Sequence, residues 1–344
     1  MTDPEARAQS VANDTTVSVL MPSFNHACFI EEAVRSVWTQ SYRNVELVVI
    51  DDGSSDGSLE LLQALRSVSP INMIVEGQEN QGVTKTLNRA LGLASGDIIC
   101  LLASDDFYDP QYVEKYVAAF RQAGEPVVLH CDARPVDKYG RIGRSTYALT
   151  GHKPAIGKCF EGLATSSLRV IAGSMAMPRR LLTDIGGYDE SIKSEDFDIL
   201  LRLSQKARFE FINEPLYCSR VVGGSLGRKP WVWAEGTVTA LSKHRDALGE
   251  RFDEIMMRRQ VRLAYVCFVH GSIRHGLHWS ARALCAKPRK TATVSLIGTL
   301  GWSMISGIVQ HQSKLWLPDH IRRSLAQHLK KITRRLRANT TKSG

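Results

Sequence analysis

The chain of 344 residues lacks several features that mark whole classes of protein. Its seven cysteines are odd in number and widely spread, and none forms a Cys-x-x-Cys pair, which argues against a disulfide framework and against a zinc or redox site. No segment repeats with a period of 20–50 residues, which argues against a solenoid or a propeller. The polar stretch 1–16 lacks the basic start and apolar run of a secretory signal, so we expect a loose leader on a cytoplasmic protein.

Acidic residues are scarce in one part of the chain only. Residues 1–224 hold 22 Lys and Arg against 29 Asp and Glu, whereas residues 225–344 hold 22 against 6. The net charge of +9 therefore arises in the C-terminal third. Gly, Ser and Pro cluster at Gly223–Pro230, so we expect a domain over 17–224 followed by a basic, mainly helical accessory region over 225–344.

Short β-branched runs alternate with segments of helical periodicity in the N-terminal half. This is the pattern of βαβ units on a mainly parallel sheet, so the expected fold class is α/β, with a mixed sheet flanked by helices. Strands are expected at Val17–Met21, Val45–Ile50, Asn72–Glu76, Asp97–Leu102 and Val127–Cys131. Helices are expected at 28–40, 57–67, Gly82–Ala94, from Asp109-Pro110 onward, and at Glu195–Ser204.

Polar or acidic segments follow three of these strands: Pro22–Asn25, Asp51–Gly57 and Ser104–Asp106. Taken singly, an Asp-Gly-Ser loop is usually a turn, an Asp-Asp pair is often a helix cap, and Glu195-Asp196 reads as a solvated first turn of a helix. Ligands of open parallel sheets bind outside the carboxyl ends of the strands, so the three segments together predict a binding site. No Gly-x-Gly-x-x-Gly follows the first strand, which argues against a dehydrogenase.

Three longer stretches carry a family resemblance. They are VSVLMPSFNHACFIEEAVRSVWTQSYRNVELVVIDDGSSDGS, ENQGVTKTLNRALGLASGDIICLLASDD and AGSMAMPRRLLTDIGGYDESIKSEDFDILLRL, in that order. Over about residues 17–220 the chain resembles the inverting glycosyltransferases of family 2, which have the Rossmann-like GT-A fold. The resemblance implies a nucleotide-sugar-binding catalytic domain over 17–224.

The resemblance implies a nucleotide site at the first two strand ends. Pro22, Ser23, Phe24 and Asn25 match the loop that lines the base pocket. Asp52 matches the carboxylate that accepts a hydrogen bond from the uracil N–H, a strong charge-assisted contact. Gly82 permits close backbone approach, and Lys85 is expected either near the nucleotide or on a solvated helix face.

The resemblance also implies a divalent cation, Mg²⁺ or Mn²⁺, at the third strand end. Ser104 and Asp105 match nucleotide-binding positions, and Asp105 and Asp106 match the acidic motif that holds ribose and metal. The cation is needed because carboxylates alone repel the diphosphate. The family motif has an acid where this chain has Ala103, and many members carry a metal-binding His near Val222.

Asp196, beside Glu195, matches the general base that takes the proton of the acceptor hydroxyl. Gly173, Ser174 and Gly187–Asp189 match segments near the acceptor and the donor sugar. The expected activity is transfer of a sugar, with inversion, from a UDP-sugar to a hydroxyl of a glycan or lipid-linked acceptor in cell-envelope polysaccharide biosynthesis. A catalytically decayed nucleotide-binding or scaffold protein is the alternative, motivated by Ala103 and Val222.

Two C-terminal segments are open to different interpretations. The uncharged run Val294–Val309 would span about 24 Å as a helix, less than the roughly 30 Å hydrocarbon core, so a buried, an interfacial and a spanning helix all remain open. Residues 311–344 hold nine Lys and Arg against Asp319 alone. This basic amphipathic pattern predicts docking to an anionic surface at the inner membrane face or, alternatively, a solubilising helix. No nucleic-acid-binding motif accompanies the charge, so no nucleic acid is expected.

Overall fold

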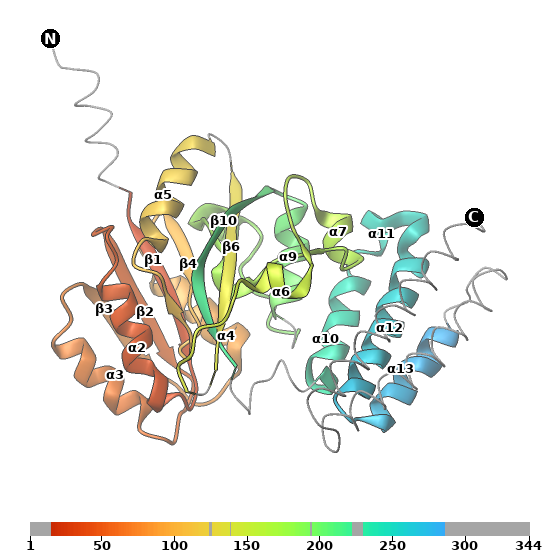
Figure 1. The fold of residues 1–344 in the computed structure, drawn as a ribbon, viewed down its shortest axis with the longest axis horizontal. Coiled ribbons are helices and arrows are strands. Elements are labelled where there is room, and N and C mark those ends of the chain that lie inside the picture. The colour runs from red at the N-terminus through yellow and green to blue at the C-terminus, as the bar shows by residue number, and fades with distance from the viewer. Residues whose placement is uncertain (1–14, 124–125, 138, 193–194, 222–229, 286–344) are drawn as a thin grey trace, which may run out of the picture. The chain divides into compact units, whose positions relative to one another are not determined.

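The computed structural model describes residues 15–123, 126–137, 139–192, 195–221 and 230–285 (Figure 1). The chain divides into two compact units, Met1–Gly223 and Gly224–Gly344. All seven cysteines are free, and five of them are buried. Buried thiols at these positions act as small apolar side chains in the core.

The first unit is built on an eight-stranded sheet with the order β3-β2-β1-β4-β9-β6-β10-β5. Its parallel half comprises β1 (Val17–Ser23), β2 (Val45–Asp51), β3 (Asn72–Gly77) and β4 (Ile98–Leu101). β1 lies between β2 and β4, so the chain moves to one side of β1 and later returns to the other. The carboxyl ends of β1 and β4 therefore border the crevice where parallel sheets bind ligands.

The other half of the sheet is mixed. β9 (Ala176–Pro178) pairs antiparallel with both β4 and β6 (Val127–Val136), and β10 (Arg208–Arg220) runs parallel to β6. The short β5 (Phe107–Tyr108) pairs antiparallel with β10 at the edge. Because β9 opposes both neighbours, β6 and β10 run in the direction of β4, and β10 ends at the same edge of the sheet as β1.

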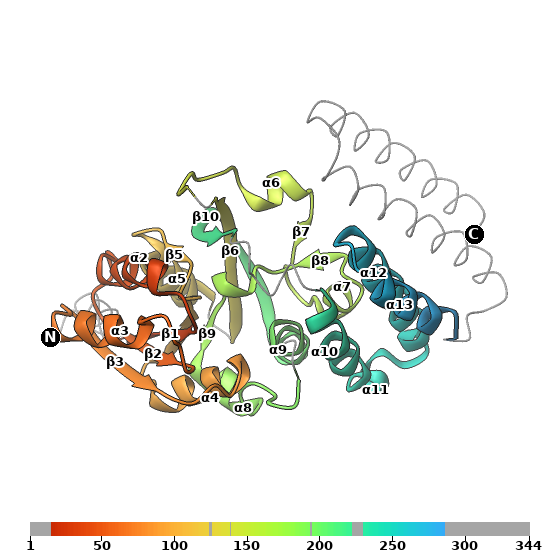
Figure 2. The same cartoon turned by 90° about the horizontal axis from the view of Figure 1, so that it is seen from below.

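Helices cover both faces of this sheet. Figure 2 shows α2 (Ala27–Trp38) and α5 (Tyr112–Ala123) on one face, with α4 (Val83–Leu93) and α8 (Arg179–Asp184) on the other. α3 (Ser58–Ser67) packs beside α2. Each helix buries one apolar stripe; in α2 the stripe is Ile30, Ala33, Val34, Val37 and Trp38.

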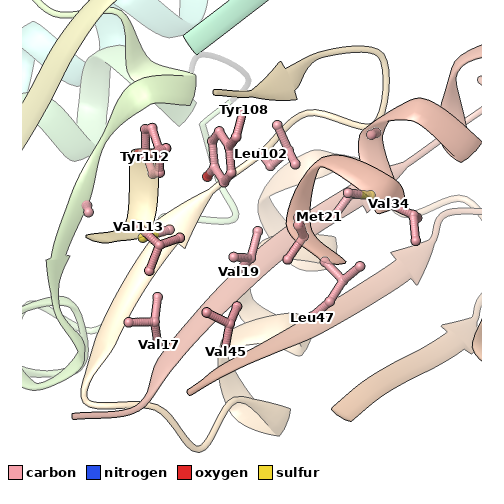
Figure 3. Close-up of a cluster of buried hydrophobic side chains, with 14 of the residues drawn as sticks. Val17, Val19, Met21, Val34, Val45, Leu47, Leu102, Tyr108, Tyr112 and Val113 are labelled. Carbon is pink, nitrogen blue, oxygen red and sulfur yellow. The ribbon is translucent and has the colours of Figure 1, made fainter. Parts of the chain in front are cut away.

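The core forms because successive side chains of β1 point to opposite faces. Val17, Val19 and Met21 lie in a row beside Val45 and Leu47 of β2 (Figure 3), in the cluster that also contains the buried side chains of α2, α3 and α5. Every residue of β2 is buried. Two-sided burial explains the continuous apolar runs in these strands.

Smaller elements connect β6 to β10. They are α6 (Thr146–Thr150), β7 (Lys153–Pro154), α7 (Phe160–Ala164), β8 (Leu168–Arg169), the 3₁₀ turn η1 (Ala172–Ser174) and α9 (Glu195–Ser204). β7 and β8 form a separate two-stranded parallel sheet. Within this connection, α9 carries the acidic pair Glu195-Asp196 in its first turn.

The described part of the second unit is helical. It contains α10 (Pro230–Ser242), α11 (Arg245–Leu248), the 3₁₀ turn η3 (Gly249–Arg251), α12 (Phe252–Val269) and α13 (Ile273–Cys285). A Cβ on Gly276 would lie 2.3 Å from the ring of Phe268, so glycine permits the close approach of α13 to α12. None of the described helices is long and apolar enough to cross a membrane.

The predicted fold class, an α/β mixed sheet flanked by helices with a helical region after it, is confirmed. The expected strands and helices are present, with ends that differ by one or a few residues. β1 continues to Ser23, and the helix expected at Asp109-Pro110 begins at Tyr112 because these residues form a turn in which the Asp109 carboxylate accepts the Gln111 N–H. The predictions for 294–309, 311–344 and Val222 lie outside the described residues.

Candidate active site

The three acidic or polar segments predicted from the sequence share one edge of the sheet. β1 and β2 pair in register so that Ser23 lies opposite Asp51. At the end of β4, the Leu102 N–H donates to the Leu20 carbonyl of β1 at 3.1 Å. The residues that follow each strand therefore leave the sheet beside one another.

The loop after β1 is tied to the loop after β2 by its own polar side chains. Ser23 is buried, and its hydroxyl donates to Asp51 at 3.2 Å. Asn25 adopts a left-handed conformation (φ +54°), donates its N–H to Ser54 at 2.8 Å, and accepts the Ser55 N–H through its side-chain oxygen at 2.8 Å. Between them Phe24 is 45% exposed, so its ring is available to a ligand.

Asp52 is 5% exposed and organises the loop before α4. Its Oδ1 accepts the Gln78 amide at 2.7 Å and the Gln81 N–H at 2.9 Å, and its Oδ2 accepts the Gly82 N–H at 2.9 Å. A carboxylate offers about four acceptor sites, so Oδ2 retains capacity for one more donor. Asp52 and Gly82, which the sequence assigned separately to the nucleotide, are thus bonded partners.

A cavity of about 410 Å³ opens beside this loop. Its lining residues are Gln78, Gln81, Lys85, Asn88, Arg89 and Glu190. Arg89 is engaged by Glu76 at 2.6 Å and by Gln78 at 3.1 Å, whereas no hydrogen bond or ion pair among the described residues involves Lys85. The Lys85 ammonium is therefore available to an anionic ligand.

Asp105 and Asp106 differ sharply in their surroundings. Asp106 Oδ2 accepts the Tyr217 hydroxyl at 2.6 Å, and its Oδ1 accepts the Arg220 N–H at 2.7 Å. Burial and the neighbouring Asp105 charge raise the pKa of Asp106 to about 7. By contrast, Asp105 accepts no hydrogen bond from the described residues, and its side chain is 16% exposed. Of the two carboxylates, Asp105 is therefore the one available to a ligand.

The partners of Asp106 come from β10, which the sequence did not link to the acidic motif. The Arg220 guanidinium lies over the rings of Phe29 at 4.9 Å and Phe107 at 5.4 Å, and pairs with Glu32. These contacts join α2, β5 and β10 behind the acidic motif. Only the pairing of distant strands reveals them, because no local spacing connects residue 106 to residue 220.

His26 is a further residue that sequence reasoning missed. It directly follows the loop after β1, and its Nδ1 lies 2.8 Å from the hydroxyl oxygen of Ser104 and 4.0 Å from Asp105 Oδ1. Ser104 is 1% exposed, so this hydrogen bond is at the base of the site. The adjacency of β1 and β4 creates the contact.

Glu195 and Asp196 begin α9 as an interacting acidic pair. Asp196 is exposed at its surface, and desolvation raises its pKa to about 6. Desolvation, followed by the charge of Asp196, raises the pKa of Glu195 to about 8. Both carboxyls are therefore more basic than free ones, and Asp196, the more exposed of the two, is accessible to an acceptor.

Hydrogen bonds connect the cavity wall to the turn at 187–190, which precedes this pair in the chain. Asn88 of α4 accepts the Tyr188 N–H at 2.8 Å and donates to the Tyr188 carbonyl and to Glu190, both at 2.9 Å. Burial and then the charges of Asp196 and Glu195 raise the pKa of the Tyr188 phenol. Gln78, which bonds to Asp52, and Asn88, which bonds to this turn, thus line the same cavity.

An ion pair within α9 and hydrogen bonds to the preceding turn also hold this helix in place. Arg202 pairs with Asp198 at 2.7 Å and donates to the carbonyls of Ile185 at 3.0 Å and Gly187 at 2.7 Å. Both side chains are largely buried, so the pair fixes the helix against the preceding turn. Asn88 and Arg202 have ordinary helical positions in the sequence, which explains why they carried no signal of this role.

Ser174 is buried, and Gly173 beside it is partly buried. The Ser174 hydroxyl bonds to backbone groups of Ile171 and Cys131, and its carbonyl accepts the hydroxyls of Tyr112 and Tyr116. Gly173 lies against Tyr217, the residue that holds Asp106. The geometry gives both residues a supporting role behind the site.

A comparison with protein families decides the class of this domain. Residues 18–185 match the model described as glycosyl transferase family 2. The domain belongs to this family. The match includes Asp52, Asp105 and the loop after β1, and it ends before the glycosyltransferase domain reaches Glu195.

Curated relatives of the glycosyltransferase domain include large synthases. Chondroitin synthase of Escherichia coli is 29% identical over 209 residues, which are 60% of this chain and 29% of that protein. Hyaluronan synthase of Pasteurella multocida is 28% identical over 60% of this chain and 20% of that protein. The chain therefore spans less than a third of the length of these two relatives.

Solved structures share the fold at lower identity. Residues 1–349 of S. aureus TarS in complex with UDP-GlcNAc are 20% identical, with a TM-score of 0.62 over 87% of this chain and 91% of that one. The mannosyltransferase PcManGT from Pyrobaculum calidifontis, in complex with GDP-Man and Mn²⁺, is 17% identical, with a TM-score of 0.54 over 88% of each chain. The first unit thus has the GT-A fold expected from the sequence.

Proposed function

We propose that this protein transfers a sugar, with inversion at the anomeric carbon, from a UDP-sugar to a hydroxyl of a glycan or lipid-linked acceptor. The observation that carries the proposal is that the loop after β1, Asp52 and Asp105 gather at one edge of the sheet in a family 2 domain, which also presents the acidic pair Glu195-Asp196 at the start of α9. The UDP-GlcNAc complex of TarS and the hyaluronan and chondroitin synthases among the relatives support a UDP-sugar.

The nucleotide end of the site would read the base through Phe24 and Asp52. The exposed Phe24 ring offers a face for stacking, and Asp52 Oδ2 offers an acceptor for the ring N–H of uracil. Pro22, Ser23, Asn25 and Gly82 would act mainly by holding this loop in shape. Lys85 would pair with an anionic group of the donor from the cavity wall.

The donor's diphosphate would lie at Asp105. Mg²⁺ and Mn²⁺ are commonly held by one or two carboxylates together with substrate phosphates, so the single free carboxylate of Asp105 fits such an ion. When bound, the ion neutralises the charge that develops on the leaving diphosphate. Asp106 would support the motif through Tyr217 and Arg220. The Mn²⁺ in the PcManGT complex supports a divalent cation as part of the proposal.

Asp196 would act as the general base. Its carboxylate would accept the proton of the acceptor hydroxyl while that oxygen attacks the anomeric carbon from the face opposite the diphosphate, so that one displacement inverts the configuration. Glu195 would remain protonated beside it at neutral pH, since its pKa is about 8.

The decisive experiment is release of UDP from a panel of nucleotide sugars, with GDP-mannose as the purine counterpart. The D196N variant should keep Mn²⁺-dependent UDP binding and lose about 10²- to 10⁴-fold in transfer rate, the usual contribution of a general base. D184N, which alters an exposed acid on α8, is the matched control. Full transfer by D196N would refute the base assignment, and absence of UDP binding and release would refute the function.

A decayed, non-catalytic relative is the competing class, motivated by Ala103. In that case D105A would change neither UDP affinity nor product formation.

We also propose an organisation for the whole chain. Residues 17–224 form the catalytic domain, and residues 225–344 form an accessory region. Within that region, residues 311–344 dock this otherwise cytoplasmic protein to an anionic membrane surface. Unchanged vesicle binding after truncation of 311–344 would overturn the last of these.

A further inference from the structure

The acidic loop after β4 is held at two points on either side of Asp105. On one side, Tyr217 and Arg220 bind both oxygens of Asp106. On the other side, the Ser104 hydroxyl is bonded to His26 Nδ1 at 2.8 Å. Ala103, at the position where the family motif has an acid, brings no polar side chain. Asp105 therefore depends on its neighbours for its orientation.

The His26 ring is itself well anchored. Its backbone N–H donates to the Ser58 hydroxyl at 3.1 Å, and its ring packs edge-on against Phe29 with centroids 6.2 Å apart. The side chain is 31% exposed, so it lines the site without being buried in the core. The ring has the support needed to fix another group in place.

We infer that His26 is a positioning residue of the Asp105 end of the site. Through its hydrogen bond to Ser104 it holds the loop so that the Asp105 carboxylate points at the cation and diphosphate. Ala103 cannot contribute to this orientation, because it has no polar side chain. This inference rests on the proposed function. Partners of metal ligands of this kind typically change metal affinity about 10- to 100-fold when they are removed.

The test is Mn²⁺ binding to the UDP complex, measured from the free Mn²⁺ signal in electron paramagnetic resonance. H26A and S104A should each weaken Mn²⁺ binding about 10- to 100-fold, and the double variant should lose no more than either one, because both remove the same contact. H26N should retain the affinity, since its amide can occupy the position of Nδ1, whereas H26Q should not. C28A, an exposed position on the same helical turn, is the control and should bind Mn²⁺ normally.

UDP binding without metal and cooperative thermal unfolding should be retained in H26A, H26N, H26Q and C28A, which separates positioning from loss of fold. Normal Mn²⁺ affinity in H26A, additive losses in the double variant, or rescue by H26Q but not by H26N would each overturn the role of His26. A wild-type protein without Mn²⁺-dependent UDP binding would instead overturn the proposed function, and this inference with it.

Discussion

The aspartates of this site have different roles because their hydrogen-bonding partners differ. Asp51 and Asp106 have their oxygens engaged by hydroxyl and N–H donors within the protein, so they shape loops. Asp105 has no such donor among the described residues and remains available to a ligand. Asp196 lies close to Glu195, and the packed protein around it makes it a stronger base than a free aspartate.

The pH dependence of transfer should identify the base. A general base works in its ionised form, so the rate should fall as the pH drops below the pKa of about 6 expected for Asp196. We expect kcat to be half-maximal near that pH and to form a plateau above it. A midpoint near pH 8 would point to Glu195 instead, whose pKa is about 8. A pH–rate profile measured at saturating donor distinguishes the two.

Any larger residue at position 173 would displace the side chain of Tyr217. A Cβ at position 173 would lie 2.2 Å from the Tyr217 hydroxyl, so G173A must displace the ring that holds Asp106. We expect a loss of about 1–3 kcal/mol of stability from overpacking together with reduced transfer, seen in thermal unfolding and in kcat. G92A, at an exposed helical glycine with open space around it, should lower neither. Unchanged activity in G173A would mean that Tyr217 does not position Asp106.

At the scale of elements, one buried carboxylate joins several strands. Glu46 of β2 is 3% exposed and accepts hydrogen bonds from Ser18 of β1 at 2.6 Å, from Asn72 of β3 at 3.0 Å, and from the Ser95 N–H before β4 at 2.7 Å. Burial by itself would raise the pKa of Glu46, but these donors outweigh it and hold the pKa below 4.5. Glu46 thus bonds β2 to both of its neighbouring strands, β1 and β3, near their N-terminal ends.

E46Q should therefore destabilise the domain. The glutamine amide places N–H groups against donors, and lost charge-assisted hydrogen bonds cost about 1.5–3 kcal/mol. Because the folded-state pKa is lowered, the difference between wild type and E46Q should be fully present above pH 4.5 and shrink as the pH falls further. Urea unfolding at pH 7 and at pH 4 measures both effects. E60Q, at an exposed glutamate of α3, should leave stability unchanged at both.

Elements with strong periodicity were predictable, and the others were not. β2 and α2 could be predicted because the apolar residues of β2 are nearly continuous and those of α2 recur at helical spacing. β10 is only partly buried, contains Pro215, and changes register against β6 between Ile212 and Tyr217, so it lacks a clean period of two. β9 is three residues long and is defined by its neighbours on both sides rather than by its own composition.

At the scale of the whole molecule, the first unit has a core of its own, built from the sheet and its flanking helices within residues 17–217. We expect a fragment of residues 1–223 to unfold cooperatively and to bind UDP with Mn²⁺ as tightly as the full chain does. Calorimetry of the fragment and of the full chain provides the comparison. A fragment that fails to fold would show that the first unit depends on the second for stability, and a fragment that folds without binding UDP would show that the second unit contributes to UDP binding.

The sequence by itself determined the α/β class, the positions of the strongly apolar strands and the three strand ends where polar residues gather, because these depend on local composition and period. It also carried the family resemblance, which resides in contiguous motifs. Tertiary structure alone decided how those motifs interact: that Asp52 holds Gly82, that Asp106 is bound by Tyr217 and Arg220, and that His26 reaches Ser104. Each of these contacts joins residues 30 to 114 positions apart, and only strand order and register bring them within hydrogen-bond distance.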